Sequence, residues 1–147
     1  MASDALLPAR RAILATLKAD LAVTELVPAS SIYPQVAAPS PTWPFIIYGS
    51  PSGLPIRSAC VDGTEVTVAI HSFARARMVG SQMMETAEDH AARIGAAVAR
   101  ALDGKRPELP GGGYLRISYR GSQLLIDGAE ADAFHHIVNF RCRAITS

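Results

Sequence analysis

The chain has 147 residues, enough to bury about 70% of the surface that its unfolded form exposes, so we expect one domain spanning residues 1–147. Its 14 lysines and arginines against 13 aspartates and glutamates give a formal net charge of +1, which indicates neither a nucleic-acid-coating protein nor a membrane-surface protein. Charged residues make up only 18% of the chain and the mean hydropathy is +0.18. Part of the surface is therefore expected to be covered by other subunits.

The cysteines and the N-terminal segment exclude several further classes. Cys60 and Cys142 belong to no CxxC or CxxH pair, so the sequence predicts reduced thiols rather than a disulfide framework or a zinc knuckle. Charged residues interrupt the apolar ones of positions 1–21, which fits neither a signal peptide nor a membrane span of about 20 apolar residues. We expect a protein that is made and kept soluble.

The first expected element is an amphipathic helix of about four turns that begins near Leu6. Apolar residues such as Ile13 and Leu17 recur near helical spacing. Ser3 is a candidate N-cap, and Pro8 is tolerated in the first turns of a helix. A short helical turn is expected next, over residues 24–27.

Extended segments and loops follow this helix. Residues 32–33 are expected to be extended, and residues 34–44 contain four prolines, which fix φ, remove donors and predict a loop. The apolar run at 45–48 predicts a strand buried on both faces or at an interface. Residues 50–63, with two prolines and two glycines, are interpreted as a long connecting loop.

The clearest strand covers residues 63–75, in the stretch GTEVTVAIHSFAR. Its side chains alternate with a period of two. One face carries Val66, Val68 and Ile70, and the other carries Thr67, Ala69 and His71.

A long second helix is expected from about residue 80 to residue 103, ending at Gly104. Asp89 and Arg93 are spaced as a favourable i,i+4 ion pair. The residues predicted on its buried face are Met84, Ala87, Ala91, Ile94, Val98 and Leu102.

The C-terminal third predicts three strands, over residues 114–120, 122–128 and 134–146. In the last strand Val138, Phe140, Cys142 and Ala144 are expected to face inward, with Asn139, Arg141 and Arg143 outward. The order helix, strands, helix, strands predicts an α+β fold, in which a mainly antiparallel sheet has two helices packed on one face.

The candidates for catalytic or metal chemistry are weak. His71 has no acid or nucleophile at a telling spacing, so a surface or interface position on a sheet is the better interpretation. Glu85 and Asp89 would lie one turn apart on the expected helix, but a solvated helix face explains them without a metal. His135 and His136 are adjacent on a strand, so they point to opposite faces and cannot chelate one ion together.

Short motifs and basic residues give no catalytic signal either. The stretch GSPSG at 49–53 misses the G-x-S-x-G spacing, and GKRPELPGGG lacks the order that a phosphate-binding loop needs. Arg75, Arg77, Arg141 and Arg143 could contact phosphates, but without interleaved aromatic residues a solvated face is the better interpretation. We expect no enzyme activity and no catalytic, cofactor-binding or metal-binding residues.

The order of these segments resembles the tail completion, or tail terminator, family of long-tailed bacteriophages and gene transfer agents. The resemblance spans nearly the whole chain and rests on order rather than on any single motif. Phe73 departs from the family, whose members often carry tryptophan there, and residues 50–63 form a longer insertion than usual. The segments that carry the resemblance are Leu26-Val27, Ile32-Tyr33, the run WPFIIYG at 43–49, Ser72-Phe73-Ala74-Arg75, the alanine-rich helix and the closing strand.

The resemblance implies a virion protein at the head–tail junction that is assembled in the host cytoplasm. Such a subunit forms a ring, usually a hexamer, on the last ring of the tail tube, stops polymerisation and offers a docking surface to the head-side connector or stopper. DNA would pass through its lumen. The candidate ring-facing or lumen-facing residues are His71, Arg141 and Arg143.

Residues 51–61 form the loop that we expect to project from the sheet and reach the tail tube. Leu54 and Ile56 would bury against the tube ring, with Arg57 beside them. Two alternatives remain open. A head–tail connector or neck adaptor would bind the portal side, often as a dodecamer, and a small host hydrolase or ligand-binding domain would need a pocket with convergent polar groups.

Overall fold

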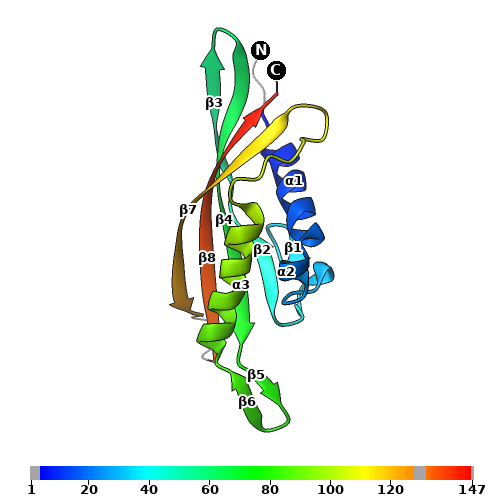
Figure 1. Ribbon diagram of the computed structural model, residues 1–147, viewed down its shortest axis with the longest axis vertical. Coiled ribbons are helices and arrows are strands. Elements are labelled where there is room, and N and C mark those ends of the chain that lie inside the picture. The colour runs from blue at the N-terminus through cyan, green and yellow to red at the C-terminus, as the bar shows by residue number, and fades with distance from the viewer. Residues whose placement is uncertain (1–3, 128–131, 147) are drawn as a thin grey trace.

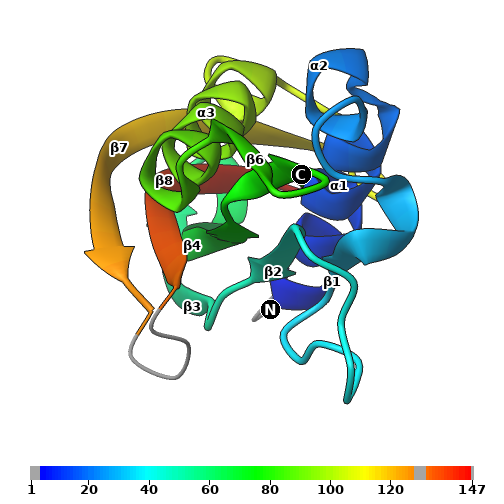
Figure 2. The same ribbon diagram turned by 90° about the horizontal axis from the view of Figure 1, so that it is seen from below.

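A mixed sheet covered by helices on one side forms the body of the molecule, which we describe from a computed structural model. The structure describes residues 4–127 and 132–146. The sheet has the strand order β1-β2-β4-β8-β7, with β3 paired to one end of β4, and all pairings are antiparallel except that of β1 with β2. Both long helices lie on the same side of this sheet (Figures 1 and 2). The predicted fold class is therefore confirmed.

The elements of the described residues follow each other in a simple order. The helices are α1 (Leu6–Ala19), α2 (Leu21–Thr24) and α3 (Ala87–Leu102), with a short 3-10 turn at Ala29–Ser31. The strands are β1 (Ile32–Tyr33), β2 (Phe45–Tyr48), β3 (Ser52–Ser58), β4 (Val61–Arg75), β5 (Arg77–Val79), β6 (Gln82–Glu85), β7 (Tyr114–Ile126) and β8 (Ala133–Ile145).

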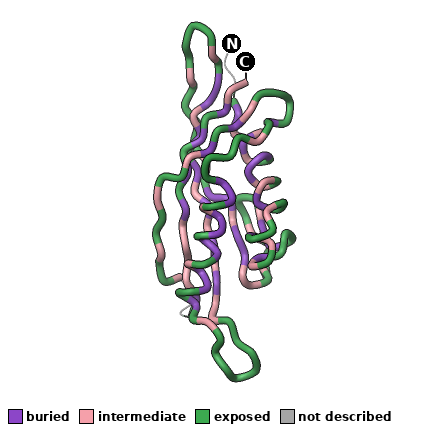
Figure 3. Tube along the Cα trace, viewed as in Figure 1, coloured by how far each residue is buried: buried purple, intermediate pink, exposed green. Residues whose placement is uncertain are grey.

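The core lies between the helices and one face of the sheet, which we call the covered face. Strands β4 and β8 pair along thirteen positions, from Gly63 opposite Ile145 to Arg75 opposite Ala133. Alternate residues of both strands are buried beneath α1 and α3 (Figure 3), as the period of two predicted. The residues that the two strands contribute to the hydrophobic core are Val66, Val68, Ile70, Ala74, Val138, Phe140, Cys142 and Ala144.

The N-terminal helices differ from their predictions at their ends. Helix α1 begins at Leu6 with Ala5 at the N-cap position, and the Leu6 amide donates to Asp4 Oδ1 at 3.0 Å. The predicted cap, Ser3, lies outside the described residues. Helix α2 begins at Leu21, earlier than the helical turn expected over 24–27, because Asp20 caps it by accepting from the amide of Val23. The expected turn continues from it, since the Val27 amide donates to the carbonyl oxygen of Val23 at 2.8 Å.

Helix α3 starts seven residues later than predicted. Thr86 is its N-cap and accepts from the Asp89 amide at 3.1 Å, while residues 80–85 belong to the β5–β6 hairpin. Met84 is therefore exposed on β6 and not part of the buried helical face, a correction of the sequence prediction. The other predicted residues of that face are buried, and Gly104, with φ of +73°, follows the helix as expected.

Two further boundaries were predicted wrongly. Residues 114–126 form the single strand β7 rather than two strands, because a bulge at Tyr119 to Gly121, with Gly121 at φ of +144°, bends the strand without ending it. The expected loop at 50–63 contains β3, which pairs with β4 from Ser52 opposite Thr67 to Ser58 opposite Val61. As an edge strand, β3 tolerates Pro55, which lacks an amide donor.

Candidate interaction surfaces

The face of the sheet that points away from the helices, which we call the open face, carries the side chains that alternate with the core. Of the residues predicted to face a neighbour or a lumen, the structure places His71, Arg141 and Arg143 together on this face. They are not adjacent, because His71 pairs in register with Ile137 whereas Arg141 pairs with Thr67. The open face thus divides into two parts of different chemistry.

The first part, which we call the aromatic half, is a row of stacked rings from four neighbouring strands. Phe73 on β4 lies between Phe45 on β2 and His135 on β8, with ring centroids 4.8 and 4.2 Å apart. Trp43 and Tyr33 contact Phe45 edge-on at 4.8 and 6.1 Å. Offset and edge-on ring pairs contribute about 0.5–1.5 kcal/mol each beyond the area they bury, so this half stabilises the sheet where α1 and α3 do not cover it.

His71 belongs to the same half, and its contacts show what holds the ring in place. Its Nδ1 lies 2.6 Å from Nε2 of His135, so one ring donates a hydrogen bond and the other accepts it. Burial lowers the pKa of His71, and burial together with the neighbouring His71 lowers the pKa of His135 to about 4. Gly49 lies against the His71 ring, where a Cβ would collide with its Nε2. His71 is therefore a packed, neutral member of the sheet.

The second part, which we call the arginine half, gathers four arginines at the other end of the open face. Arg141 and Arg143 come from β8, and Arg116 and Arg120 come from β7. Together with Ser118 they line one shallow depression. Arg116 is in register with Arg143, and Arg120 lies at the bulge.

One carboxylate lies beside two of these four cations, on the neighbouring strand. Glu65 on β4 lies 3.3 Å from Nε of Arg141 and 4.0 Å from Nε of Arg143. Arg116 and Arg120 were not predicted as part of this surface, because only the register of β7 against β8 brings them beside the arginines of the last strand. Their alternation along residues 116–120 was the one available signal.

Two hairpins extend from opposite ends of the long axis (Figure 1). At one end, the β3–β4 arm carries Leu54, Ile56 and Arg57, the residues predicted to contact the tail tube. The structure places Leu54 and Arg57 on the surface, with Leu54 68% exposed, and leaves Ile56 half-buried. A groove beside the arm is lined by Asp4, Leu6, Gly53, Leu54, Pro55, Arg57 and Thr64.

At the other end, the β5–β6 hairpin exposes four large apolar side chains. These are Met78, Val79, Met83 and Met84. This surface was not predicted from the sequence, because Met84 fits the helical periodicity that follows it. Thr86, a strong N-cap residue, was the signal that the helix begins later.

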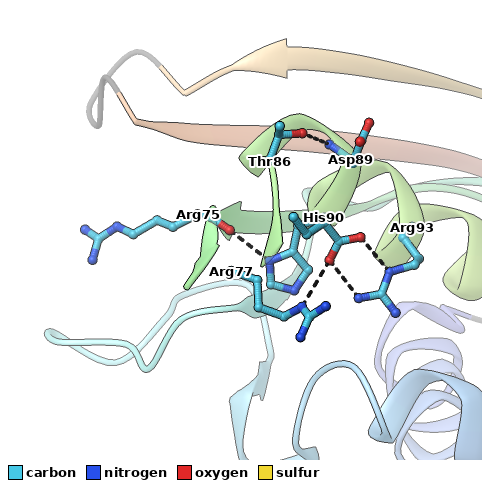
Figure 4. Close-up of polar contacts among 7 residues, drawn as sticks. Arg75, Arg77, Thr86, Asp89, His90 and Arg93 are labelled. Atoms are coloured by element: carbon cyan, nitrogen blue, oxygen red, sulfur yellow. Dashed lines mark hydrogen bonds and ion pairs between the residues drawn. The ribbon is translucent and has the colours of Figure 1, made fainter. Parts of the chain in front are cut away.

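Polar contacts fix the base of this hairpin to α3 (Figure 4). The Arg93 guanidinium donates to both carboxylate oxygens of Glu85, at 2.9 and 2.8 Å, and lowers the pKa of that carboxyl group. Arg77 lies 3.5 Å from the same carboxylate. His90 Nδ1 lies 2.8 Å from the carbonyl oxygen of Arg75. Arg93 thus pairs with Glu85 and not with Asp89, the partner predicted from the sequence. These contacts fix the orientation of the hairpin relative to α3.

The candidates for metal chemistry do not come together. His135 faces the aromatic half, whereas His136 lies on the covered face against Gly95 of α3. Within residues 4–127 and 132–146, no group of three or more His, Cys, Asp or Glu side chains could hold a metal ion. None of the helices in this part of the chain combines the length and the apolar character needed to cross a membrane.

Comparisons with known proteins agree with the fold. A solved chain from the virion of a native gene transfer agent particle is 21% identical, with a TM-score of 0.72 and coverage of 95% of this chain and 94% of that chain. A second solved structure is 12% identical, with a TM-score of 0.51 and coverage of 93% and 95%. No curated protein matched the sequence. The sequence model of the family described as tail completion protein gp17 matches residues 11–145. The chain therefore belongs to the tail completion protein gp17 family and is a structural protein of a phage-type tail.

Proposed function

We propose that this protein is a tail terminator, a ring that caps the tail tube, stops its polymerisation and provides the docking surface for the head-side connector. The ring is hexameric, lies at the head–tail junction of the virion and is assembled in the host cytoplasm. Membership of the tail completion family supports this proposal. No catalytic step is part of it.

The observation that carries the proposal is the pair of projecting hairpins at opposite ends of an elongated subunit (Figure 1), one with a single exposed large apolar side chain and the other with four. A terminator must contact two different partners, the tube on one side and the connector on the other. The β3–β4 arm presents Leu54, and the β5–β6 hairpin presents Met78, Val79, Met83 and Met84. Large exposed apolar side chains that gather on a projecting segment mark contact sites, and methionine adapts to irregular partner surfaces.

A ring also needs a contact between neighbouring subunits that uses two different surfaces of each subunit. Within the described residues the sheet has two suitable free edges. One is β3, which pairs with β4. The other is the second half of β7, since residues 103–108 hydrogen-bond to the outer edge of β7 only as far as Tyr119. Exposed apolar residues lie along the β7 edge, namely Tyr119, Leu125 and Ile126. Strand edges with such residues favour pairing with another chain, which supports a closed ring.

The assembly state tests this proposal directly. Mass photometry of the purified protein, alone and with isolated tail tubes, should show a species six times the 15.6 kDa subunit mass, bound at tube ends. A dodecamer that binds portal particles and ignores tubes would identify a neck adaptor instead. A strictly monomeric protein in both conditions would refute the ring.

The β3–β4 arm is the proposed contact with the tube. Leu54→Asp should leave the melting temperature and the ring mass unchanged, because Leu54 is exposed on an edge strand, but it should produce overlong tails in electron micrographs. Burying a side chain of this size stabilises a contact by about 1.5–3 kcal/mol, and the ring repeats the contact in each subunit. Ser58→Asp, an equal change of charge at an exposed site on the same strand, is the control.

A further inference from the structure

The arginine half is a concentration of charge that the fold itself does not need. Arg116 and Arg143 lie opposite each other in register, and like charges at such positions destabilise a sheet. Glu65 offsets part of this repulsion, but its partners Arg141 and Arg143 keep 52% and 63% of their side-chain surface exposed. Exposed ion pairs of this kind contribute little to stability. Four guanidinium groups line the depression, and the Glu65 carboxylate contacts two of them, so the excess positive charge indicates an anionic partner.

We propose that the arginine half binds the phosphate backbone of duplex DNA. Arginine presents a planar fork of donors that matches two phosphate oxygens, and the hydroxyl of Ser118 lies among the four forks as a further donor. Along β7, side chains on one face repeat about every 6.6 Å, so the cations form a row rather than a single point. Phosphate contacts of this type position a duplex without reading its sequence.

The chemistry of the depression favours nucleic acid over an acidic protein surface. The side chains that line it are all polar, whereas stable protein contacts contain buried aromatic or aliphatic anchors. Aromatic side chains do occur on the same sheet face, but they belong to the aromatic half, which is centred on Phe73 and His135 further along β4 and β8. The absence of stacked rings among the arginines also favours a duplex over a single strand, whose bases would need aromatic platforms.

This inference rests on the proposed function for its place in the virion, where the arginine half would face the path of the DNA. Four phosphate contacts give weak binding at physiological salt. Weak, sequence-independent contacts hold a duplex on the ring axis and still allow it to move.

Fluorescence anisotropy with a labelled 20-base-pair duplex tests the proposal on the purified protein. We expect log K to fall against log salt with a slope of about −3.6 for one engaged subunit, which weakens binding about 100-fold between 50 and 200 mM salt, and with a steeper slope if several subunits of the ring contact the duplex. The variant with Arg116→Gln, Arg120→Gln, Arg141→Gln and Arg143→Gln should lose this binding. Changing the four arginines to lysine should keep the slope and lower the affinity, because the charge stays while the fork is lost.

The matched control removes four positive charges elsewhere, with Arg11, Lys18, Arg100 and Lys105 changed to Gln. All four are exposed and lie outside the arginine half, so DNA binding should persist. Equal loss in both glutamine variants would overturn the proposal, as would a folded wild-type protein that does not bind DNA at 50 mM salt. If the wild-type protein does not bind DNA and the variant with four arginines changed to glutamine no longer binds tails, the partner is an acidic protein surface and the proposal is wrong. Mass photometry of each variant reports the ring separately, so a failure here is distinguishable from a failure of the terminator proposal.

Discussion

The two faces of one sheet are built by the same strands and serve different purposes. On the covered face, β4 and β8 alternate apolar residues that α1 and α3 bury. On the open face, the intervening residues of the same strands form the aromatic half at one end and the arginine half at the other. The covered face is mostly apolar because the hydrophobic effect selects most of its residues, with Thr64, Ser72 and His136 as polar exceptions. The open face changes character along the strand, from rings that stack with one another to arginines that the fold does not need.

The largest expected effect is on the covered face, at Ile94 of α3. Ile94 is 1% exposed, so Ile94→Asp places a carboxylate without a partner in the core and should destabilise the protein by more than about 4 kcal/mol. Urea denaturation at one fixed protein concentration measures this change. Ala96→Asp, on the exposed side of the same helix, should cost only about 0.5 kcal/mol. Similar losses in the two variants would contradict the assignment of the covered face.

The covered face is also what the sequence predicts best. The alternation from Val66 to Ile70 and from Val138 to Ala144 identified the apolar buried residues in the middle of β4 and along most of β8, but not Ala74 or Ala133, and helical spacing identified most of those of α3. The error at Met84 has a local cause, because a methionine in phase with the following helix cannot be separated from it by periodicity alone.

The open face could be predicted only in part, because its sites depend on pairing between distant strands. Arg141 and Arg143 stood out within one strand, but Arg116 and Arg120 join them only through the register of β7 with β8. The ring stack likewise joins Phe45, Phe73 and His135 from three strands. Pro55 led to the interpretation of β3 as a loop, since sequence alone does not show that a strand lies at an edge.

Within the open face, the aromatic half should contribute to stability. Phe73 is half-buried between two stacked rings, so Phe73→Ala should lower the free energy of unfolding by about 2 kcal/mol, less than for a fully buried phenylalanine. Thr67→Ala, at an exposed site on the same strand and face, should change it by less than about 0.5 kcal/mol. Equal and small effects would mean that the rings are a contact surface only.

A pH titration sharpens the same point through the pair of His71 and His135. The pKa values of both rings are lowered in the folded protein, that of His135 to about 4, so the unfolded chain binds protons first as pH falls. The stability from the neutral pair is fully present above the unfolded pKa of about 6.5 and is lost between pH 6.5 and 4. Since the rings are half-exposed, we expect a loss of about 1 kcal/mol.

The control for this titration is His135→Phe, which keeps a ring in the stack and removes one of the two titrating groups. Its unfolding free energy should depend less on pH over the same window, as followed by urea denaturation at pH 4.5, 5.5 and 6.5. An unchanged pH dependence would mean that other groups, such as His136, whose pKa burial also lowers, dominate the titration.

The smallest change in the free energy of unfolding is expected in the arginine half. A substitution there should stabilise the protein slightly or not at all, whereas a substitution in the aromatic half should destabilise it. Arg116 lies opposite Arg143, so Arg116→Gln relieves repulsion between the two side chains. At 20 mM salt the free energy of unfolding should stay unchanged or rise by no more than about 0.5 kcal/mol. At 500 mM salt the difference should vanish, because the Debye length shortens to a few ångströms. Glu65→Gln should have the opposite sign, since it removes the carboxylate that Arg141 and Arg143 share. A clear loss of stability in Arg116→Gln would make this arginine a structural residue, and the four arginines could no longer be explained by a partner alone.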